Sequence, residues 1–250
     1  MSQNPPFSVA GAAAWRLYEY EVAGSTNDIA RHLPAWNAVR ADAQTGGRGR
    51  YGRAFVSDPG GLWISAVVPS EGTPSRWLGF SLVVGWYVRE ALRDLGVAEA
   101  RVRWPNDLLI DRRKIAGILI EQSSAQTFIV GLGMNVSNVP WERDAGLAGI
   151  TTRLADCLPE PPSVHEMAIK VLDAIAEAHG EMTEHGLWLA AERLNTHWAD
   201  ARAVEAHLAG GKILRGCFLG IDEAGNLRVK CDGEVQTIEY QRVERMAEVT

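Results

Sequence analysis

Segment 103–117 carries a carboxylate and an ammonium group in a setting where they can act together. It reads Arg-Trp-Pro-Asn-Asp, then Leu-Leu-Ile-Asp, then Arg-Arg-Lys-Ile-Ala-Gly. The proline lacks a backbone donor and favours an extended residue before it, so a bend is expected there. Two strands, 108–110 and 114–121, follow with a polar turn between them. Because residues on either side of a hairpin turn lie on neighbouring strands, Asp107 and Lys114 are expected to face each other.

The Asp107–Lys114 pair allows two interpretations on the residues alone. It is a structural ion pair on a hairpin, or it is a cation held by a carboxylate on the floor of a site. Only four of the 25 basic residues are lysines, yet a lysine follows directly after two arginines here. Since lysine offers a compact mobile charge and arginine a rigid planar fork, this choice favours the second interpretation.

A second charged segment, 45–55, reads Thr-Gly-Gly-Arg-Gly-Arg-Tyr-Gly-Arg-Ala-Phe. Glycine lets a backbone approach a ligand closely, and the arginine fork matches phosphate. A floppy surface loop or an RG-type nucleic-acid segment has the same composition. Because the segment is isolated in an acidic chain between two expected strands, the sequence favours a mobile anion-binding loop. We expect residues 46–54 to be mobile without ligand and to fold over a bound one.

Polar side chains also gather at Ser25-Thr26-Asn27-Asp28, where a short helix is expected to begin. Ser25 with Asp28 resembles a capping box, which is a structural role. Exposed hydroxyl and amide groups at a helix N-terminus also suit a small polar ligand. Gly131-Leu132-Gly133 follows a buried strand at 128–130 and is weak evidence for a dinucleotide site, because no helix follows it. Close packing, or a ligand lying against the backbone, is the simpler interpretation of these glycines.

Further strands and helices are expected around these segments. Residues 1–14 should form a loose arm. Apolar spacing predicts a helix over 75–95, and a capping box at Ser163 and Glu166 predicts the start of another. From about Asp200, short strands alternate with glycine turns, which predicts a small all-β barrel. The other expected strands are 15–22, 38–44, 62–68, 202–207, 212–221, 226–231 and 234–240.

Composition and length limit the classes of protein that remain. The 250 residues suffice for one large domain with a small appendage, and 46% hydrophobic with 22% charged residues is typical of a soluble globular protein. The net charge of −6 argues against broad nucleic-acid binding. Three cysteines without metal-ligand spacing are expected to be reduced thiols in the cytoplasm. The sequence shows no secretory signal and no apolar run of about 20 residues, the length that a membrane span needs.

Together these motifs resemble the biotin–protein ligases, and the resemblance covers nearly the whole chain. Four blocks stand in the family's order: Ser25-Thr26-Asn27; Gln44 with Gly47 to Arg53; Arg103 to Asp107 with Lys114 to Gly117; and Gly131 to Val136. The fold that the resemblance implies is α+β. It is a mixed sheet packed with helices, like the catalytic domain of class II aminoacyl-tRNA synthetases, followed by a small SH3-like C-terminal β-barrel. The resemblance implies a catalytic biotin- and ATP-binding domain at 1–199 and the SH3-like domain at 200–250.

The activity that the resemblance implies is ATP-dependent ligation of biotin to a protein. Biotin and ATP would give biotinoyl-AMP and pyrophosphate with the help of Mg²⁺. Biotin would then pass to a specific lysine of a biotin carboxyl carrier protein domain of a biotin-dependent carboxylase. We expect a cytoplasmic monomer or weak homodimer with neither nucleic acid nor membrane as a partner. The room before the first motif is too small for the DNA-binding domain of bifunctional members, so we expect a monofunctional ligase.

The resemblance also implies roles for particular residues. Lys114 would approach both the biotin carboxylate and the α-phosphate, and Arg50 would bind phosphate. Asp107 would act as the base for the acceptor lysine or would only orient Lys114. The implied biotin-binding residues are Ser25, Thr26, Asn27, Gln44, Arg48, Gly49, Arg50, Trp63, Lys114, Gly117 and Ile118. The implied ATP- or adenylate-binding residues are Arg48, Arg50, Phe55, Trp104, Asn106 and Asn135. No residue is assigned to a metal.

Two positions depart from the family's pattern, and three alternatives stay open. Arg103 stands where lysine is usual and keeps the charge, and Phe55 stands where tryptophan is usual and can still stack on adenine. A lipoate/octanoate–protein ligase shares the fold, although a dithiolane ring does not need the polar set at 25–27 and Gln44. A nucleic-acid-binding regulator would use the arginines of the loop. A non-catalytic scaffold would bind biotin and ATP without making an adenylate.

Overall fold

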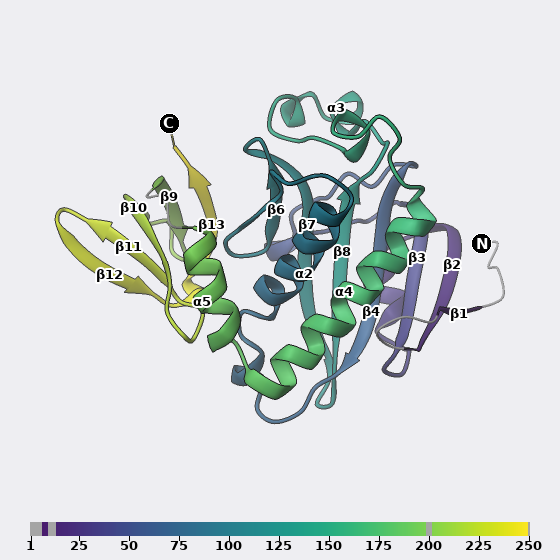
Figure 1. Cartoon of the computed structure of the whole chain (residues 1–250), viewed down its shortest axis with the longest axis horizontal. Coiled ribbons are helices and arrows are strands. Elements are labelled where there is room, and N and C mark those ends of the chain that lie inside the picture. The colour runs from purple at the N-terminus through teal and green to yellow at the C-terminus, as the bar shows by residue number, and fades with distance from the viewer. Residues whose placement is uncertain (1–6, 10–13, 199–201, 250) are drawn as a thin grey trace.

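The computed structural model describes residues 7–9, 14–198 and 202–249, which form two β-sheets and several helices (Figure 1). The strands of the larger sheet are β1 (Phe7–Val9), β2 (Trp15–Ala23), β3 (Asn37–Gln44), β4 (Gly61–Pro69), β5 (Arg101–Arg103), β6 (Asp107–Ile110), β7 (Arg113–Ser124) and β8 (Thr127–Asn135). Their order is β1-β2-β3-β4-β8-β7-β6-β5. Strands β2 and β3 run parallel and the other neighbours run antiparallel, so the sheet is mixed, as predicted.

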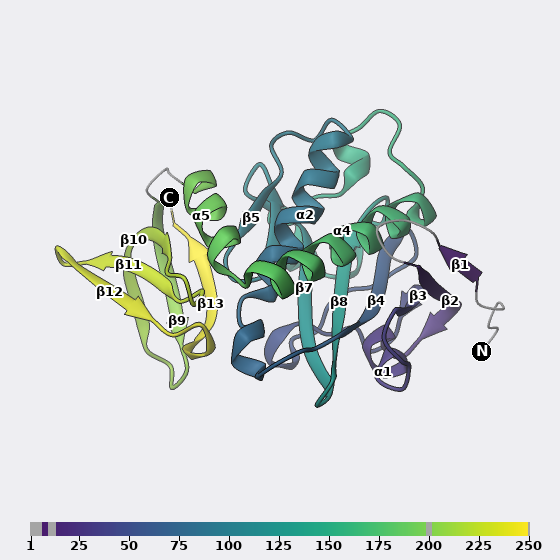
Figure 2. The ribbon, with the colours of Figure 1, turned by 60° about the horizontal axis from the view of Figure 1, so that its bottom comes forward.

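Helices cover the two faces of this sheet unequally. Helices α2 (Phe80–Asp94) and α4 (Val164–His185) lie across one face, and the short α1 (Thr26–Ala30) lies on the other (Figure 2). Alternate residues of β4 show the division. Ile64 belongs to the large core with the two long helices, whereas Val67 packs in a small cluster with Ala30 of α1. The α1 face of the sheet thus carries less helix than the face under α2 and α4.

Helix starts agree with the sequence in one case and differ in another. Helix α4 begins at the predicted capping box, where Ser163 Oγ accepts from Glu166 N at 3.2 Å and Glu166 Oε2 accepts from Ser163 N at 2.8 Å. The helix predicted over 75–95 begins only at Phe80, because Gly79 adopts a left-handed conformation (φ 80°) and separates a short 3₁₀ turn at Pro74–Trp77. Helices α3 (Pro140–Arg143) and α5 (Trp188–His197) complete the described set.

The β6–β7 hairpin contains an irregularity that matters for the site. Asp107 pairs with Gly117 and Leu109 pairs with Lys114, so the register shifts by one residue between them. The extra residue is Ile115, which is fully buried in the core beside Ala116. This β-bulge lets Lys114 and Gly117 point to the same face as Asp107. The turn is the predicted one, with Asp111 and Arg112 both at positive φ.

The C-terminal strands form a separate five-stranded antiparallel sheet. They are β9 (Arg202–Leu208), β10 (Ile213–Ile221), β11 (Leu227–Cys231), β12 (Glu234–Ile238) and β13 (Val243–Glu248). Their order is β12-β11-β10-β9-β13, and the two end strands do not pair in the described residues. The predicted barrel is therefore an open sheet. The carbonyls of Val243 and Glu244 in β13 accept from Arg50 and Arg53 of the large sheet's loop, so this strand contacts the large sheet as well as β9.

Two other expectations need correction. The N-terminal arm contains strand β1, whose residues pair with Trp15 to Leu17, while residues 1–6 and 10–13 lie outside the described part. Strand β13 was not expected at all. The predicted domain boundary at 199/200 also lies outside the described residues, so the two domains stay a prediction. No helix in the described chain combines the length and the apolar character needed to cross a membrane.

Candidate active site

A cavity of about 250 Å³ opens on the α1 face of the large sheet. Strands β7 and β8 form its floor, α1 and the glycine–arginine loop form its walls, and β13 forms part of its rim. It collects most of the residues that the sequence predicts. Those predicted residues are Ser25, Thr26, Asn27, Gln44, Arg48, Gly49, Arg50, Phe55, Asn106, Asp107, Lys114, Gly117 and Ile118.

Glycines keep the floor of the cavity open. Gly117 of β7 lies directly opposite Gly133 of β8, and Gly131 lies two residues further along. A Cβ at Gly133 would stand 2.8 Å from the Phe55 ring, and one at Gly117 would stand 2.8 Å from Lys114 Nζ. Side chains at these positions would fill the space that the polar groups and a ligand need. The glycines thus let protein side chains approach the backbone of the sheet, which fits both close packing and a ligand lying against the backbone.

Three charged groups meet at one end of the cavity. Lys114 Nζ lies 2.6 Å from Asp107 Oδ1, and Arg103 Nη2 lies 2.5 Å from Asp107 Oδ2. The backbone of Lys114 is fixed as well, since its N–H donates to Ile150 O and its carbonyl accepts from Thr152 N. The expected facing of Asp107 and Lys114 is confirmed. Phe55 lies beside them, with its ring centroid 5.2 Å from Lys114 Nζ.

Opposing effects act on the Asp107 carboxyl. Burial alone would raise its pKa, but the positive charges of Lys114 and Arg103 and their hydrogen bonds outweigh burial and hold the pKa below its usual value. Asp107 is therefore an ionised partner of two cations. A carboxylate in this state is a weak proton acceptor, which favours an orienting role over that of a base.

Acid is expected to weaken this cluster. Because the folded-state pKa of Asp107 lies below its usual 3.8, the ion pairs stabilise the fold above about pH 3.8, and that stabilisation is lost as the pH falls through the folded-state pKa. The free energy of unfolding of Asp107→Asn should therefore fall less between about pH 5 and pH 3 than that of the unsubstituted protein. Urea unfolding at both pH values measures this difference. Equal losses in the two proteins would contradict the coupling.

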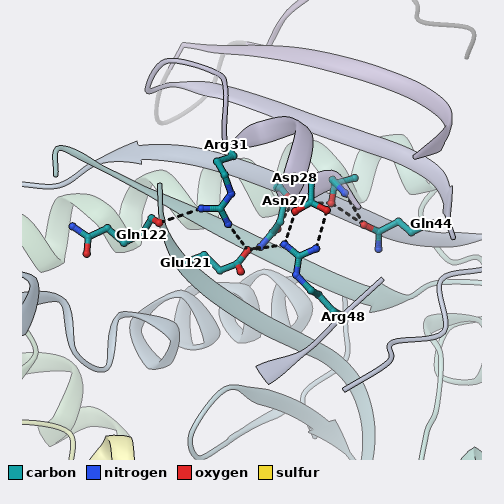
Figure 3. A network of polar contacts seen from close by, with 9 residues as sticks. Asn27, Asp28, Arg31, Gln44, Arg48, Glu121 and Gln122 are labelled. Carbon is teal, nitrogen blue, oxygen red and sulfur yellow. Dashed lines mark hydrogen bonds and ion pairs between the residues drawn. The ribbon is translucent and has the colours of Figure 1, made fainter. Parts of the chain in front are cut away.

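A chain of hydrogen bonds organises the polar end of the cavity (Figure 3). Thr26 N and Oγ1 donate to Gln44 Oε1 at 2.8 and 3.0 Å, and Gln44 Nε2 donates to Ser57 Oγ at 3.0 Å. Asn27 Oδ1 accepts from Ser65 Oγ, and Asn27 Nδ2 donates to Glu121 at 2.7 Å. These contacts fix which end of each amide faces the cavity.

The predicted capping box of α1 does not form. Ser25 is the N-cap residue, but its side chain makes no capping hydrogen bond. Asp28 instead forms two hydrogen bonds with Arg48, of 2.7 and 2.9 Å. Ser25 lines the cavity but is only 5% exposed, so its hydroxyl is a buried group of the cavity wall and not the exposed group of the second interpretation.

The glycine–arginine loop is a small hairpin whose tip rests on β13. Phe55 N donates to Gly47 O, and Gly49 N donates to Arg53 O. At the tip, Arg50 Nη2 donates to Val243 O at 3.0 Å, and its guanidinium lies 5.3 Å from the Tyr240 ring centroid. The loop thus connects the cavity of the large sheet to the C-terminal sheet.

Three predicted residues lie behind the cavity wall. Trp63 is fully buried, donates to Asp58 O and supports Phe55 edge to face at 5.8 Å. Trp104 is also buried and donates to Gly225 O, so it joins the bend before Asp107 to the C-terminal sheet. The Asn135 amide donates to Thr152 O and accepts from Asn138, close to the segment that fixes Lys114.

Several residues in or next to the cavity were not predicted from the sequence. Ser65 and Glu121 complete the hydrogen-bond chain, and Glu244, Arg245 and Met246 of β13 reach the rim. A lone carboxylate directly after the apolar run 118–120 was a usable signal for Glu121. Nothing local in the sequence marks Ser65 or the tail strand as part of the site.

Two family models match the chain. Residues 24–135 match the Biotin/lipoate A/B protein ligase family, and residues 202–240 match the Biotin protein ligase C terminal domain. The chain is 33% identical over 228 residues to the Bifunctional ligase/repressor BirA of Escherichia coli (strain K12), which covers 86% of this chain and 69% of that protein. It is 30% identical over 245 residues to the Biotin--[acetyl-CoA-carboxylase] ligase of Mycobacterium tuberculosis. That alignment covers 92% of this chain and 89% of the relative.

Solved structures share the fold. The Biotin protein ligase from Aquifex aeolicus in complex with biotin and ATP matches with a TM-score of 0.80 at 26% identity, over 93% of this chain and 99% of that one. The Biotin Protein Ligase from Leishmania major in complex with Biotinyl-5-AMP matches in fold with a TM-score of 0.63 at 21% identity, over 89% and 98%. Both the cavity-bearing sheet and the C-terminal sheet thus have counterparts in relatives of similar length. The chain belongs to the biotin protein ligases of the biotin/lipoate A/B protein ligase family.

Proposed function

We propose that the chain is an ATP-dependent biotin–protein ligase that works in two half-reactions. First, a carboxylate oxygen of biotin attacks the α-phosphorus of ATP, and the bond to pyrophosphate breaks to leave biotinoyl-AMP. Then the amine of an acceptor lysine attacks the acyl carbon, and AMP leaves. The observation that carries the proposal is that Lys114 shares one cavity with Arg50 and with the polar residues 25–27 and Gln44.

Charge neutralisation is the first requirement, because biotin and ATP are both anions. The ammonium of Lys114 offers a compact cation whose position Asp107 fixes. Arg50 offers a second cation, and its contacts with Val243 O and the Tyr51 and Tyr240 rings are all with neutral groups. The charge of Arg50 is therefore available to phosphate oxygens.

Recognition of biotin would use the opposite end of the cavity. The ureido ring presents one carbonyl acceptor and two N–H donors. Residues 25–27 and Gln44 offer hydroxyl and amide groups that match them, held in place by the chain of hydrogen bonds. The glycine floor leaves room for the fused rings, and Leu119, on the same face of β7 as Gly117, supplies apolar contact. The side chain of Ile118, which the resemblance implies for biotin, packs instead in the core on the α2 side of the sheet. Phe55 lies near Lys114, where an adenine could stack on it.

Asp107 would orient Lys114 rather than take the proton of the acceptor lysine. Its carboxylate already binds Lys114 and Arg103, and its lowered pKa makes it a weak base. The acceptor amine would then lose its proton to solvent or to the leaving phosphate group. We propose this orienting role in preference to the role of base, the other role that the sequence left open for Asp107.

Mg²⁺ would enter with ATP. Among the described residues, no group of three or more His, Cys, Asp or Glu side chains is placed to hold a metal ion. Mg²⁺ commonly keeps several waters and binds through nucleotide phosphates with few protein ligands, which fits a cavity of this kind. Bound in this way, the ion would neutralise part of the phosphate charge. Lys114 and Arg50 would neutralise the remaining negative charge of the phosphates and of the biotin carboxylate.

The acceptor that we propose is a biotin carboxyl carrier protein domain of a biotin-dependent carboxylase. We propose that the ligase acts in the cytoplasm as a monomer or weak homodimer. The M. tuberculosis relative carries acetyl-CoA-carboxylase in its name. The three cysteines have no disulfide partners, which fits a reducing compartment. We further propose that the chain does not bind DNA, because its net charge is −6.

Transfer of labelled biotin to a carrier domain tests the function directly. Incorporation should require ATP and Mg²⁺, and biotin but not lipoate should stimulate exchange between pyrophosphate and ATP. Stimulation by lipoate alone would favour the lipoate–protein ligase alternative. Biotin and ATP binding without exchange would favour a non-catalytic scaffold.

Protection of the glycine–arginine loop by ligand is a further expectation. Among the described residues, the hydrogen bonds from its tip to β13 come from the side chains of Arg50, Tyr51 and Arg53, so the tip could open and close over a bound adenylate that water must not reach. Trypsin should cut at Arg50 or Arg53 at least about tenfold more slowly once biotin and ATP are added. Equal cleavage rates in empty and filled protein would contradict a closing loop.

A further inference from the structure

Arg48 makes different contacts from Arg50, although both belong to the same loop. Its Nη1 and Nη2 donate to the two carboxylate oxygens of Asp28 at 2.9 and 2.7 Å, and Nη2 also lies 3.2 Å from Glu121 Oε2 (Figure 3). Both ends of the guanidinium fork are thus occupied by carboxylates. The hydrogen bond with Asp28 raises the pKa of Arg48, and the same bond lowers the pKa of Asp28.

Glu121 joins this pair to the biotin end of the cavity. The same Oε2 atom accepts from Asn27 Nδ2 at 2.7 Å and lies 3.4 Å from Arg31 Nη2. Since Asn27 Oδ1 accepts from Ser65 Oγ, the Asn27 amide is held from both sides. A carboxylate accepts and does not donate, so Glu121 allows only the orientation in which the Asn27 nitrogen faces it.

The charges around Arg48 cancel. Arg31 and Arg48 stand against Asp28 and Glu121, two positive groups against two negative ones. A phosphate that approached Arg48 would have to displace at least one carboxylate and would be repelled by the other. In the part of the chain that the structure describes, no carboxylate forms an ion pair with Arg50, so Arg48 and Arg50 are not equivalent as anion ligands.

Building on the proposed ligase function, we infer that Arg48, Asp28 and Glu121 are positioning residues: they anchor the base of the loop to α1 and β7 and orient Asn27 for biotin. The loop then moves from Gly49 onward, and the base at Gly47 and Arg48 stays in place. This differs from the expectation that Arg48 binds phosphate. The inference also restricts the mobile part of the loop, expected over residues 46–54, to the tip that begins at Gly49.

Substitution of Asp28 or Glu121 distinguishes a phosphate-binding Arg48 from an anchoring Arg48, because the two roles predict different changes in KM. If Arg48 bound phosphate, Asp28→Asn and Glu121→Gln would free it, and the KM for ATP would fall or stay the same. If Arg48 anchors the loop, both variants and Arg48→Gln should raise the KM for biotin. We expect about tenfold for Glu121→Gln, which removes a charged hydrogen bond. About twofold to threefold is expected for Asp28→Asn, because that side chain is 58% exposed.

Two further readouts distinguish positioning from a loss of overall structure. Trypsin should cleave the loop tip faster in all three variants, while the KM for ATP changes less than about twofold. The double variant Asp28→Asn with Arg48→Gln should show no more effect than Arg48→Gln alone, since both remove one pair. Arg48→Lys should not restore the KM for biotin, because one ammonium cannot bridge two carboxylates with a fork.

Glu205→Gln is the matched control, because Glu205 also pairs with an arginine, Arg215, but lies on the C-terminal sheet. It should leave both KM values and the cleavage rate unchanged. An unchanged KM for biotin in Glu121→Gln and Asp28→Asn would overturn the inference, as would a raised KM for ATP in Arg48→Gln with a lowered one in Asp28→Asn. If Glu121→Gln fails to fold, the more exposed Asp28→Asn decides alone. Biotin transfer by the unsubstituted protein, measured beside them, shows separately whether the proposed function holds.

Discussion

The Lys114→Ala variant is expected to form biotinoyl-AMP about 10²–10³-fold more slowly than the unsubstituted protein. Lys114 Nζ is the compact cation at the charged end of the cavity, 2.6 Å from Asp107 Oδ1. Without it, two anions must meet beside an ionised carboxylate that retains only Arg103 as a partner. The lost interaction forms mainly in the transition state, so the rate should fall much more than biotin affinity.

Biotin-dependent exchange of pyrophosphate measures the first half-reaction, and calorimetric titration measures biotin binding. Lys212→Ala is the control, because Lys212 is an exposed lysine in the turn before β10. It should exchange pyrophosphate at the rate of the unsubstituted protein. If Lys114→Ala lost biotin affinity and rate in equal measure, Lys114 would be a ground-state ligand and the proposed role in neutralising the transition state would fail.

Gly131→Ala is expected to lower biotin affinity by about 10²-fold, through lost hydrogen bonds and crowding. An added Cβ would stand 2.3 Å from Asn27 Oδ1 and 3.0 Å from Asn27 Cγ. Asn27 cannot shift easily, because Ser65 and Glu121 hold both ends of its amide. The single methyl group should therefore disturb the orientation of the polar groups that face biotin.

Gly180→Ala is the matched control for this change. Gly180 lies within α4, and a Cβ there would meet nothing within 4 Å. Its biotin affinity should not change, and its stability should rise by up to about 1 kcal/mol, since alanine favours a helix. Normal biotin binding by Gly131→Ala would show that Asn27 is not part of the biotin site.

Local patterns were enough to predict the charged end of the cavity. Asp107 and Lys114 are neighbours across a tight hairpin, so their meeting depends on a turn and two short strands. The capping box at Ser163 was predictable for the same reason, because all its atoms lie within four consecutive residues. The biotin- and ATP-binding roles of the other site residues were implied by the family resemblance and not by local sequence patterns.

Contacts between distant segments could not be predicted in the same way. Asn27 meets Glu121 across 94 positions, and Arg50 meets Val243 across 193. Such pairs depend on the order of strands in the sheet, which a single sequence does not reveal. The capping box predicted for α1 was wrong because Asp28 has a stronger partner, Arg48, that only the folded chain brings near.

The bulge at Ile115 makes the spacing of the chain as important as its side chains. Lys114 and Gly117 are three positions apart, so in an unbroken strand they would point to opposite faces of the sheet. Deleting Ile115 would remove no polar residue from the hairpin. It would nevertheless point the Lys114 ammonium toward the opposite face of the sheet, into the hydrophobic core. A deletion or insertion in this hairpin should therefore abolish adenylation even at positions where a substitution is tolerated. An engineered ligase must keep the number of residues between Asp107 and Gly117.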